Sequence, residues 1–270
     1  MGNKKQHIIP AAYLRAWSYP AAPPGSLGSV WVIQKSNMSE RGLRSPEGCF
    51  CSEDRYTLPS NGGRNLAVEN ALAAVEGEFG RAQKRLRANS ALRPKDIVYL
   101  SFFSAAMMSR TGHYPERIGT LLRTVQRQAA RLAAKEGSEP SLSNAIEEGL
   151  RSLNAETART GIIEFAKLLI QMRLSVFVTD DEAGFITGDE PCVVCVPGGR
   201  HPFLGHQDVE FTLPLSPRHL AFYSWKVPPT MYSNLDRVKV DEVNSRTMAG
   251  CRKEFVSWKG IVRNEWIAAH

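Results

Sequence analysis

The sequence predicts an α+β fold, in which helices and strands occupy separate stretches of the chain. Between residues 66 and about 172 apolar residues recur at helical spacing, whereas after Arg173 they alternate with a period of two. Because the two patterns do not interleave, we expect helices and sheet to be segregated. The prediction is a central bundle of four or five helices, packed with a mainly antiparallel C-terminal sheet and a small N-terminal cap that contains β-structure.

The length and composition favour one folded unit. A chain of 270 residues exceeds the usual domain size of about 100–150 residues but fits one core with added elements. We predict a single domain over residues 1–270, with an N-terminal motif and cap (1–64), a helical region (65–173) and a sheet with a C-terminal helix (174–270). Hydrophobic residues make up 43% and charged residues 23%, which excludes long disorder, collagen and coiled coil.

Nothing in the sequence indicates a membrane or secreted protein. No run of about 18 apolar residues occurs, and Pro10 and Arg15 stand where a signal peptide would be apolar. The five cysteines are odd in number and widely dispersed, which is typical of a reducing compartment. We therefore expect a cytoplasmic protein with no membrane partner, whose oligomeric state the sequence does not indicate.

The helical region is divided by turn-forming residues. The N-terminal part before it has a proline break at residues 20–24, a predicted strand at 30–33 and a second at about 49–58. Helix breaks then fall at residues 90–94, 112–115 and 137–140. The helix that begins near Pro94 is apolar nearly all round, so it is expected to be the central helix of the bundle.

The C-terminal region is predicted to form strands and a last helix. Strands are expected at residues 176–178, 185–187, 193–194, 209–215 and 220–225. The turn at residues 180–184 suits a β-hairpin. Asp241 is a candidate cap for a final helix that runs to about Phe255.

Positive charge is concentrated in one part of the chain. The net charge is +7, but residues 81–135 hold twelve Lys or Arg against only Asp96 and Glu116, a local +10 that leaves −3 elsewhere. Four cations recur every four residues and share one helix face, with no carboxylate at i±4 before the helix break at 137, namely Arg123, Arg127, Arg131 and Lys135.

This basic stripe has a functional and an ordinary interpretation. Apolar residues at 118, 121, 122, 125 and 132 are expected to face a core, which turns the stripe outward. Such unpaired cations, together with Arg110 at the end of the buried helix, suit phosphates of nucleic acid or another polyanion. The alternative is a solvated face for the stripe, and for Arg110 a favourable position at a helix C-terminus.

Three polar clusters are candidates for chemistry. The first holds His7, Tyr13 and Arg15 near the N-terminus; its alternative is a structural histidine. The second is Glu69 with Glu76, whose spacing places both carboxylates on one helix face; its alternative is surface pairing with cations such as Arg81 and Lys84. The third is Asp189, projected by a loop at the end of a strand; its alternative is a turn-forming residue.

Other site motifs have little support. Cys192-x-x-Cys195 with His201 and His206 suggests zinc, but residues three apart on a strand point to opposite faces. The patterns GxxxxGK[ST], GxGxxG, GxSxG and HExxH are absent from the sequence. No nucleotide cofactor is therefore indicated.

The order of five segments resembles a bacterial family known as domain of unknown function 4238. The resemblance covers most of the chain and rests on Lys5-x-His7-x-x-Pro10-x-x-Tyr13-Leu14-Arg15-x-Trp17, Cys51 to Tyr56, Glu69 with Glu76, Thr187-x-Asp189-x-Pro191, and Pro214-Leu215-Ser216-Pro217. The chain departs from the family's usual Thr-Ser-Asp-Asn-Pro by carrying Gly188 and Glu190. The resemblance brings no activity, but it implies that the scattered polar residues form one site, namely His7, Tyr13, Arg15, Glu76 and Asp189.

The leading hypothesis is a nucleic-acid-directed, metal-assisted phosphodiesterase, an activity that would suit bacterial defence or toxin action. Asp189 and Glu76 would hold a divalent cation such as magnesium or manganese, and His7 would orient or deprotonate water. Arg15 or Arg110 would stabilise charge on the phosphate. The alternative is a non-enzymatic module that binds nucleic acid or protein, with structural polar motifs. A third interpretation is an enzyme acting on a small anionic metabolite.

Overall fold

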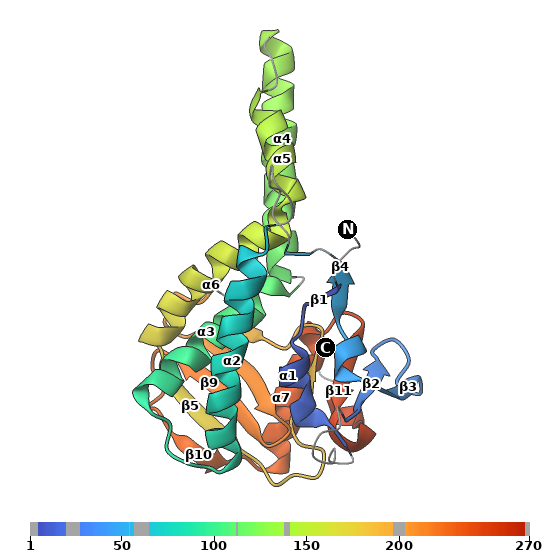
Figure 1. Cartoon of the computed structure of the whole chain (residues 1–270), viewed down its shortest axis with the longest axis vertical. Coiled ribbons are helices and arrows are strands. Elements are labelled where there is room, and N and C mark those ends of the chain that lie inside the picture. Colours follow the sequence, from blue (N-terminus) through green and yellow to red (C-terminus); the bar gives the residue numbers. More distant parts are fainter. Residues whose placement is uncertain are drawn as a thin grey trace.

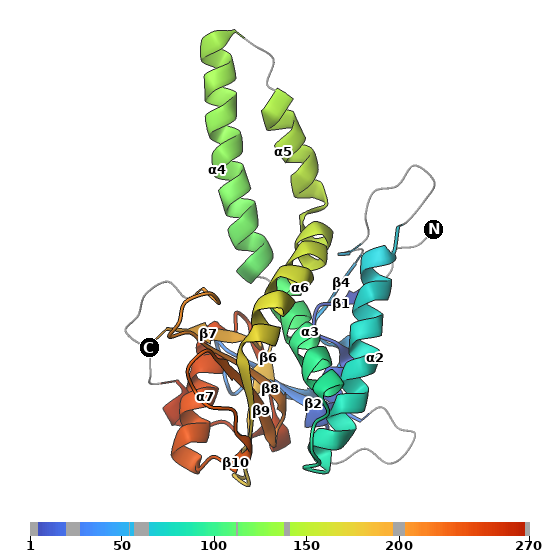
Figure 2. The ribbon, with the colours of Figure 1, turned by 90° about the vertical axis from the view of Figure 1, so that its left-hand side faces the viewer.

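The computed structural model describes residues 5–19, 28–53, 55–56, 65–111, 113–137, 141–196 and 203–267. It confirms the α+β fold (Figure 1). Helices α2 (Ala67–Arg87), α3 (Pro94–Arg110) and α6 (Leu153–Gln171) lie on one side of the main sheet. Helices α4 (His113–Glu136) and α5 (Ser141–Arg151) form a hairpin that projects from the rest of the molecule (Figure 2). We call this hairpin the arm and the rest of the molecule the body.

The main sheet has five strands in the order β10-β5-β9-β8-β7. Its neighbours are antiparallel except for β10 and β5, which run parallel. The mainly antiparallel sheet is therefore confirmed. Its strands are β5 (Arg173–Val178), β7 (Val193–Cys195), β8 (Glu210–Ser216), β9 (His219–Ser224) and β10 (Met231–Asn234).

The N-terminal strands join strands from the C-terminal region. A four-stranded sheet has the order β3-β2-β11-β6, and β1 pairs separately with β4. Val32 of β2 pairs with Val256 of β11, so the predicted cap is tied to the end of the chain. These strands are β1 (Lys5–His7), β2 (Val30–Gln34), β3 (Arg41–Arg44), β4 (Cys51–Glu53), β6 (Thr187–Gly188) and β11 (Glu254–Ser257).

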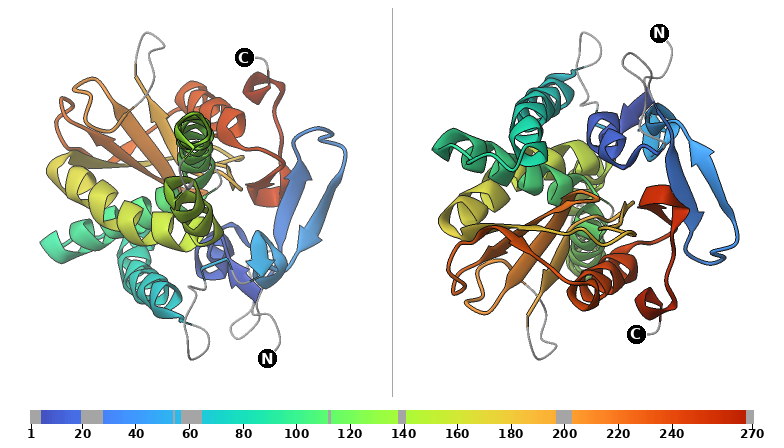
Figure 3. Two further views of the ribbon diagram at one scale, coloured as in Figure 1. Left: turned by 90° about the horizontal axis from the view of Figure 1, so that it is seen from above. Right: turned by 90° about the horizontal axis from the view of Figure 1, so that it is seen from below.

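Helix α3 occupies the centre, as its apolar composition predicts. Leu100 and Phe103 are fully buried, and the Phe103 ring stacks on Phe79 of α2 with 3.7 Å between centroids. Figure 3 shows α3 between α2, α6 and the sheet. The core is completed by short elements around it, namely α1 (Ala11–Leu14), α7 (Arg237–Gly250) and 3₁₀ turns at Arg15–Trp17, Pro46–Gly48, Trp258–Gly260 and Asn264–Trp266. No described helix is long and apolar enough to span a membrane.

The expectation that the apolar face of α4 meets a core is wrong for most of its length. Leu121, Val125 and Leu132 are 60%, 39% and 58% exposed. The reason is that the arm leaves the body, so α5 is the neighbour of α4 along the arm (Figure 2). One partner helix covers only part of an apolar stripe that would be buried in a bundle.

Two other expectations are corrected in the C-terminal region. Gly184 N donates to Asp181 O, so residues 180–184 do form a turn, but the strand that follows is β6, which pairs with β11 rather than with β5. Helix α7 is capped by Asp236, whose Oδ1 accepts from Lys239 N at 2.9 Å, and it ends at Gly250 rather than near Phe255. Asp241 lies within α7 and accepts from the Trp266 indole at 2.7 Å. The proline break at 20–24 lies outside the described residues, as do residues 54, 57 and 58 of the strand expected at about 49–58.

Candidate functional site

Tyr13 joins three of the sequence motifs at one buried point. Its hydroxyl lies 2.7 Å from Thr187 Oγ1 and 2.7 Å from the Pro214 carbonyl oxygen. Burial raises the pKa of Tyr13 well above its ordinary value, so the hydroxyl stays protonated. Because a carbonyl can only accept, Tyr13 donates to Pro214 and Thr187 donates to Tyr13. The motif position is therefore a structural junction.

The other residues of the first motif are also held by structural contacts. The Trp17 indole donates to Phe185 O at 2.7 Å. Arg15 forms an ion pair with Glu47, with 2.5 Å between Nη2 and Oε1, on the surface of the molecule. A hydrogen bond from Ser45, together with Arg15, lowers the pKa of Glu47 to about 2. Arg15 thus has a carboxylate partner of its own.

Asp189 is engaged by the backbone at the start of β11. Its Oδ1 accepts from Arg252 N at 2.8 Å, and its Oδ2 accepts from Lys253 N at 2.7 Å and Glu254 N at 3.2 Å. Both oxygens therefore stabilise the turn between α7 and β11.

The glycine before Asp189 suits this turn. A Cβ on Gly188 would lie 2.5 Å from Cys251 Sγ and 2.7 Å from Glu254 O. Gly188 therefore permits the close approach of β6 to β11, and Asp189 beside it makes its three hydrogen bonds to the backbone.

Four residues singled out in the sequence line one small cavity of about 110 Å³, which we call the N-terminal cavity: His7 of β1, Glu69 and Glu76 of α2, and Arg110 of α3. Asp189, Tyr13 and Arg15 do not line it. The structure thus assembles part of the expected site and places the rest elsewhere.

The polar groups of the N-terminal cavity are paired with one another and with their neighbours. Arg110 is 1% exposed, and its Nη1 lies 2.7 Å from Glu76 Oε1. Glu69 accepts from the Gln6 amide at 3.1 Å, and His7 Nε2 donates to Glu47 O at 3.3 Å. The surface partner found for Arg81 is Glu78 rather than Glu69 or Glu76. A carboxylate bound to a buried guanidinium is a poor cation ligand, because the two positive charges compete for it.

No group of three or more His, Cys, Asp or Glu side chains in the described part of the chain is placed to hold a metal ion. Cys192 and Cys195 contact different elements, since Cys192 Sγ lies 4.0 Å from Ser104 O and Cys195 Sγ lies 3.7 Å from Glu210 Oε2. His206 lies near Asp208, and His201 is outside the described residues.

The predicted basic stripe lies on the arm. Arg123, Arg127, Arg131 and Lys135 are all exposed. Arg127 bonds only along its own helix, to Arg123 O and Thr124 Oγ1. Within the described ranges, none of these four cations forms an ion pair with a carboxylate. The arm therefore presents uncompensated positive charge away from the body.

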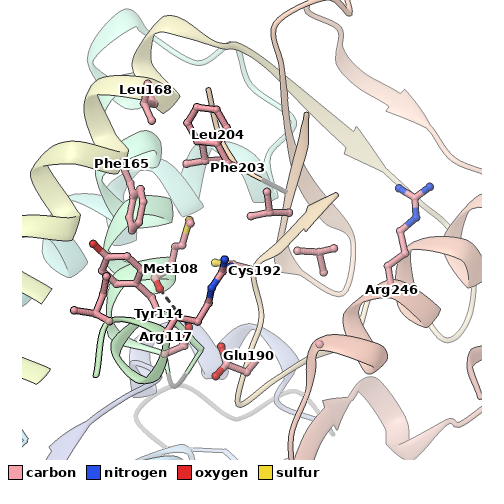
Figure 4. A pocket seen from close by; sticks show the side chains of 15 residues that line it. Met108, Tyr114, Arg117, Phe165, Leu168, Glu190, Cys192, Phe203, Leu204 and Arg246 are labelled. Atoms are coloured by element: carbon pink, nitrogen blue, oxygen red, sulfur yellow. Dashed lines mark hydrogen bonds between the residues drawn. The ribbon is translucent and has the colours of Figure 1, made fainter. Parts of the chain in front are cut away.

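A larger cavity at the foot of the arm is missed by sequence reasoning. We call it the foot cavity; its volume is about 540 Å³ (Figure 4). Its walls come from α3, α4, α6, α7, β7 and the segments before β7 and β8, including Met108, Tyr114, Phe165, Cys192 and Leu204. No local motif marks it, because segments far apart in the chain each contribute only one to three side chains.

The chain belongs to a family that is defined by sequence. The model of the family described as "Protein of unknown function (DUF4238)" matches residues 5–259, which confirms the resemblance drawn from the motifs. No curated protein and no solved structure matches the chain.

Proposed function

We propose that the protein is a nucleic-acid-binding module whose arm contacts the phosphate backbone. The observation that carries the proposal is the row of four exposed cations on α4, Arg123, Arg127, Arg131 and Lys135, without carboxylate partners in the described part of the chain. Like charges on one helix face repel each other unless an anion binds them. A polyphosphate backbone supplies repeated negative charge along the arm.

The binding mode follows from what the arm presents. The four cations contact phosphates, and stacking aromatic side chains do not alternate with them along α4. Binding is therefore expected to depend little on sequence and strongly on salt. In this proposal the polar motifs have a structural role, since the side chains of Tyr13 and Asp189 form hydrogen bonds within the protein. The proposal places the module in the cytoplasm, where its five free cysteines stay reduced.

Fluorescence anisotropy with labelled duplex and single-stranded DNA tests this function. The variant R123Q/R127Q/R131Q is compared with R81Q/R159Q/K167Q, which removes the same charge from exposed positions on α2 and α6. We expect the arm variant to lose about tenfold or more in affinity and the matched control to change less than about threefold. Equal losses in the two variants, or no binding by the native chain, would contradict the proposal.

A metal-assisted phosphodiesterase is the second candidate, because His7, Glu69, Glu76 and Arg110 line one cavity. Arg110 is also the last residue of α3, close in sequence to the start of α4. The pair Glu76 and Asp189 does not fit as joint ligands, since Asp189 is held by three backbone amides. Glu69 and Glu76 would hold the ion, with His7 positioning water, and Glu76 would have to exchange its ion pair with Arg110 for the metal.

The second candidate has a separate test. Purified protein is incubated with DNA and RNA in the presence of magnesium, manganese or chelator. Metal-dependent cleavage that is lost in His7→Ala and Glu76→Gln, with folding intact by circular dichroism, would support it. Absence of cleavage by a chain that binds DNA would leave the binding module as the function.

A further inference from the structure

The foot cavity has the form of a small-molecule site. Its volume of about 540 Å³ lies within the usual range for ligand pockets, about 300–1,000 Å³. Met108, Phe165, Leu168 and Val194 make the walls largely apolar. Tyr114 and Phe165 form an edge-to-face pair with 4.8 Å between centroids, which holds the rings at one side of the cavity.

The charges around this cavity are unevenly compensated. Arg246 is paired with Glu242 at 2.6 Å and with Glu210 at 3.2 Å. Glu190 is 3% exposed and has Arg252 at 3.8 Å. Arg117, by contrast, is exposed and has no carboxylate partner within the ranges that the structure describes. Arg117 is therefore the cation at this cavity that we consider for ligand binding.

Arg117 is aimed at the cavity. Figure 4 shows its side chain extending beside Tyr114 toward Cys192, whereas Arg246 lies at the opposite side with its guanidinium turned away. Arg117 belongs to the first turns of α4, where the arm joins the body. A ligand whose apolar part fills the cavity would place an anionic group at this guanidinium.

We propose that the foot cavity binds a small amphipathic anion, which is an aliphatic or aromatic body that carries one carboxylate or phosphate. The apolar body packs on Met108, Phe165 and Leu168, and the anionic group pairs with Arg117. Glu190, which also lines the cavity, has Arg252 at 3.8 Å, so Arg117 is the cation that we assign to the head group. This inference rests on the cavity itself and does not depend on the proposed function.

Isothermal titration calorimetry with defined probes tests this site. The probes are decanoate, decyl phosphate, the neutral decanol and adenosine monophosphate, each below the concentration at which it aggregates. We expect one saturable site for decanoate or decyl phosphate, with the tighter of the two identifying the head group. Decanol should bind about tenfold or more weakly, because it cannot form a charge-assisted hydrogen bond with Arg117.

Two matched variants connect binding to the cavity. Arg117→Gln should weaken the better anionic probe by about tenfold, while Arg81→Gln, at an exposed position on α2 outside the cavity, should leave it unchanged. Circular dichroism and thermal unfolding check that both variants fold. The proposal is overturned if neither anion saturates, if Arg117→Gln binds as the native chain does, if decanol equals decanoate, or if only adenosine monophosphate binds.

Discussion

The buried polar residues of the first motif stabilise the fold through specific hydrogen bonds. Tyr13 is fully buried, and its one hydroxyl serves both Thr187 and Pro214. These partners are distant in the chain, so the hydroxyl fixes the N-terminal segment against β6 and β8. Replacing it leaves two buried polar groups without that partner, which is more costly than the net value of one hydrogen bond.

Tyr13→Phe is expected to lower the free energy of unfolding by about 1–3 kcal/mol. Urea denaturation followed by circular dichroism measures the change. Tyr19→Phe is the matched control, because Tyr19 is 37% exposed and should change stability by less than about 0.5 kcal/mol. A loss no larger than that of the control would show that the Tyr13 hydroxyl does not hold the junction.

Asp189→Asn provides a second test at this scale. The carboxylate accepts three backbone N–H groups, and an amide offers one oxygen and an NH₂ that faces a donor. We expect the free energy of unfolding to fall by about 1–3 kcal/mol, with DNA affinity within about threefold of native. A stable Asn variant that loses a magnesium-dependent activity would instead support a metal ligand at this position.

At the scale of elements, close helix packing depends on Gly161 of α6. A Cβ at this position would lie 2.7 Å from Ser109 Cβ and 3.0 Å from Tyr114 Cε1, so α6 approaches the end of α3 and the start of α4 here. Gly77 on α2 has nothing within 4 Å of such a Cβ. The two glycines therefore differ only in their surroundings.

Gly161→Ala is expected to destabilise the protein by about 1–3 kcal/mol despite the better helix propensity of alanine. Gly77→Ala should be stabilising by about 0.5–1 kcal/mol. Thermal unfolding of both variants measures the contrast. Stabilisation by both substitutions would contradict the close packing of α6 at the foot of the arm.

Periodicity predicts the elements well because it reports local burial. The all-apolar pattern around Phe103 identifies α3 as the central helix, and alternation identifies β8 and β9. Periodicity does not predict which strands pair with each other. Nothing local shows that β2 pairs with β11, or that β10 runs parallel to β5, because these contacts join segments far apart in the chain.

The exposure of the arm is likewise not predicted by periodicity. Leu121 and Leu132 have the spacing of a buried face, yet the sequence pattern does not state how much of that face a neighbour covers. The candidate site was predicted in part, since His7, Glu76 and Arg110 do line one cavity. Asp189 was grouped with them by motif order, which does not encode distance.

At the scale of the whole molecule, His219 links the helical layer to the main sheet. Its Nδ1 lies 2.8 Å from Ser216 Oγ, and its Nε2 lies 3.0 Å from Asn89 Oδ1 beyond the end of α2. Burial lowers the pKa of His219, so the neutral ring is the form that fits the folded state. Because the pKa of His219 is lower in the folded state than in the unfolded state, the neutral ring contributes fully to stability above the unfolded pKa of about 6.5. This contribution is lost as the pH falls from there toward and through the folded pKa.

The free energy of unfolding is therefore expected to fall between about pH 7.5 and about pH 5.5, and less steeply in His219→Gln. Urea denaturation at the two pH values gives the difference for each chain. His206→Gln serves as the control for removal of a histidine, because the His206 side chain is 40% exposed. Equal pH dependence in the native and His219→Gln chains would show that His219 does not set the pH dependence of stability.

The proposed function requires the arm to bind nucleic acid through its phosphates. The most direct measurement is the salt dependence of DNA binding, as log K against log salt concentration, for the native chain and for R123Q/R127Q/R131Q. Each phosphate contact contributes about 0.9 to the slope, so loss of three contacts should reduce its magnitude by about 2–3. Identical slopes for the two chains would contradict binding through the arm.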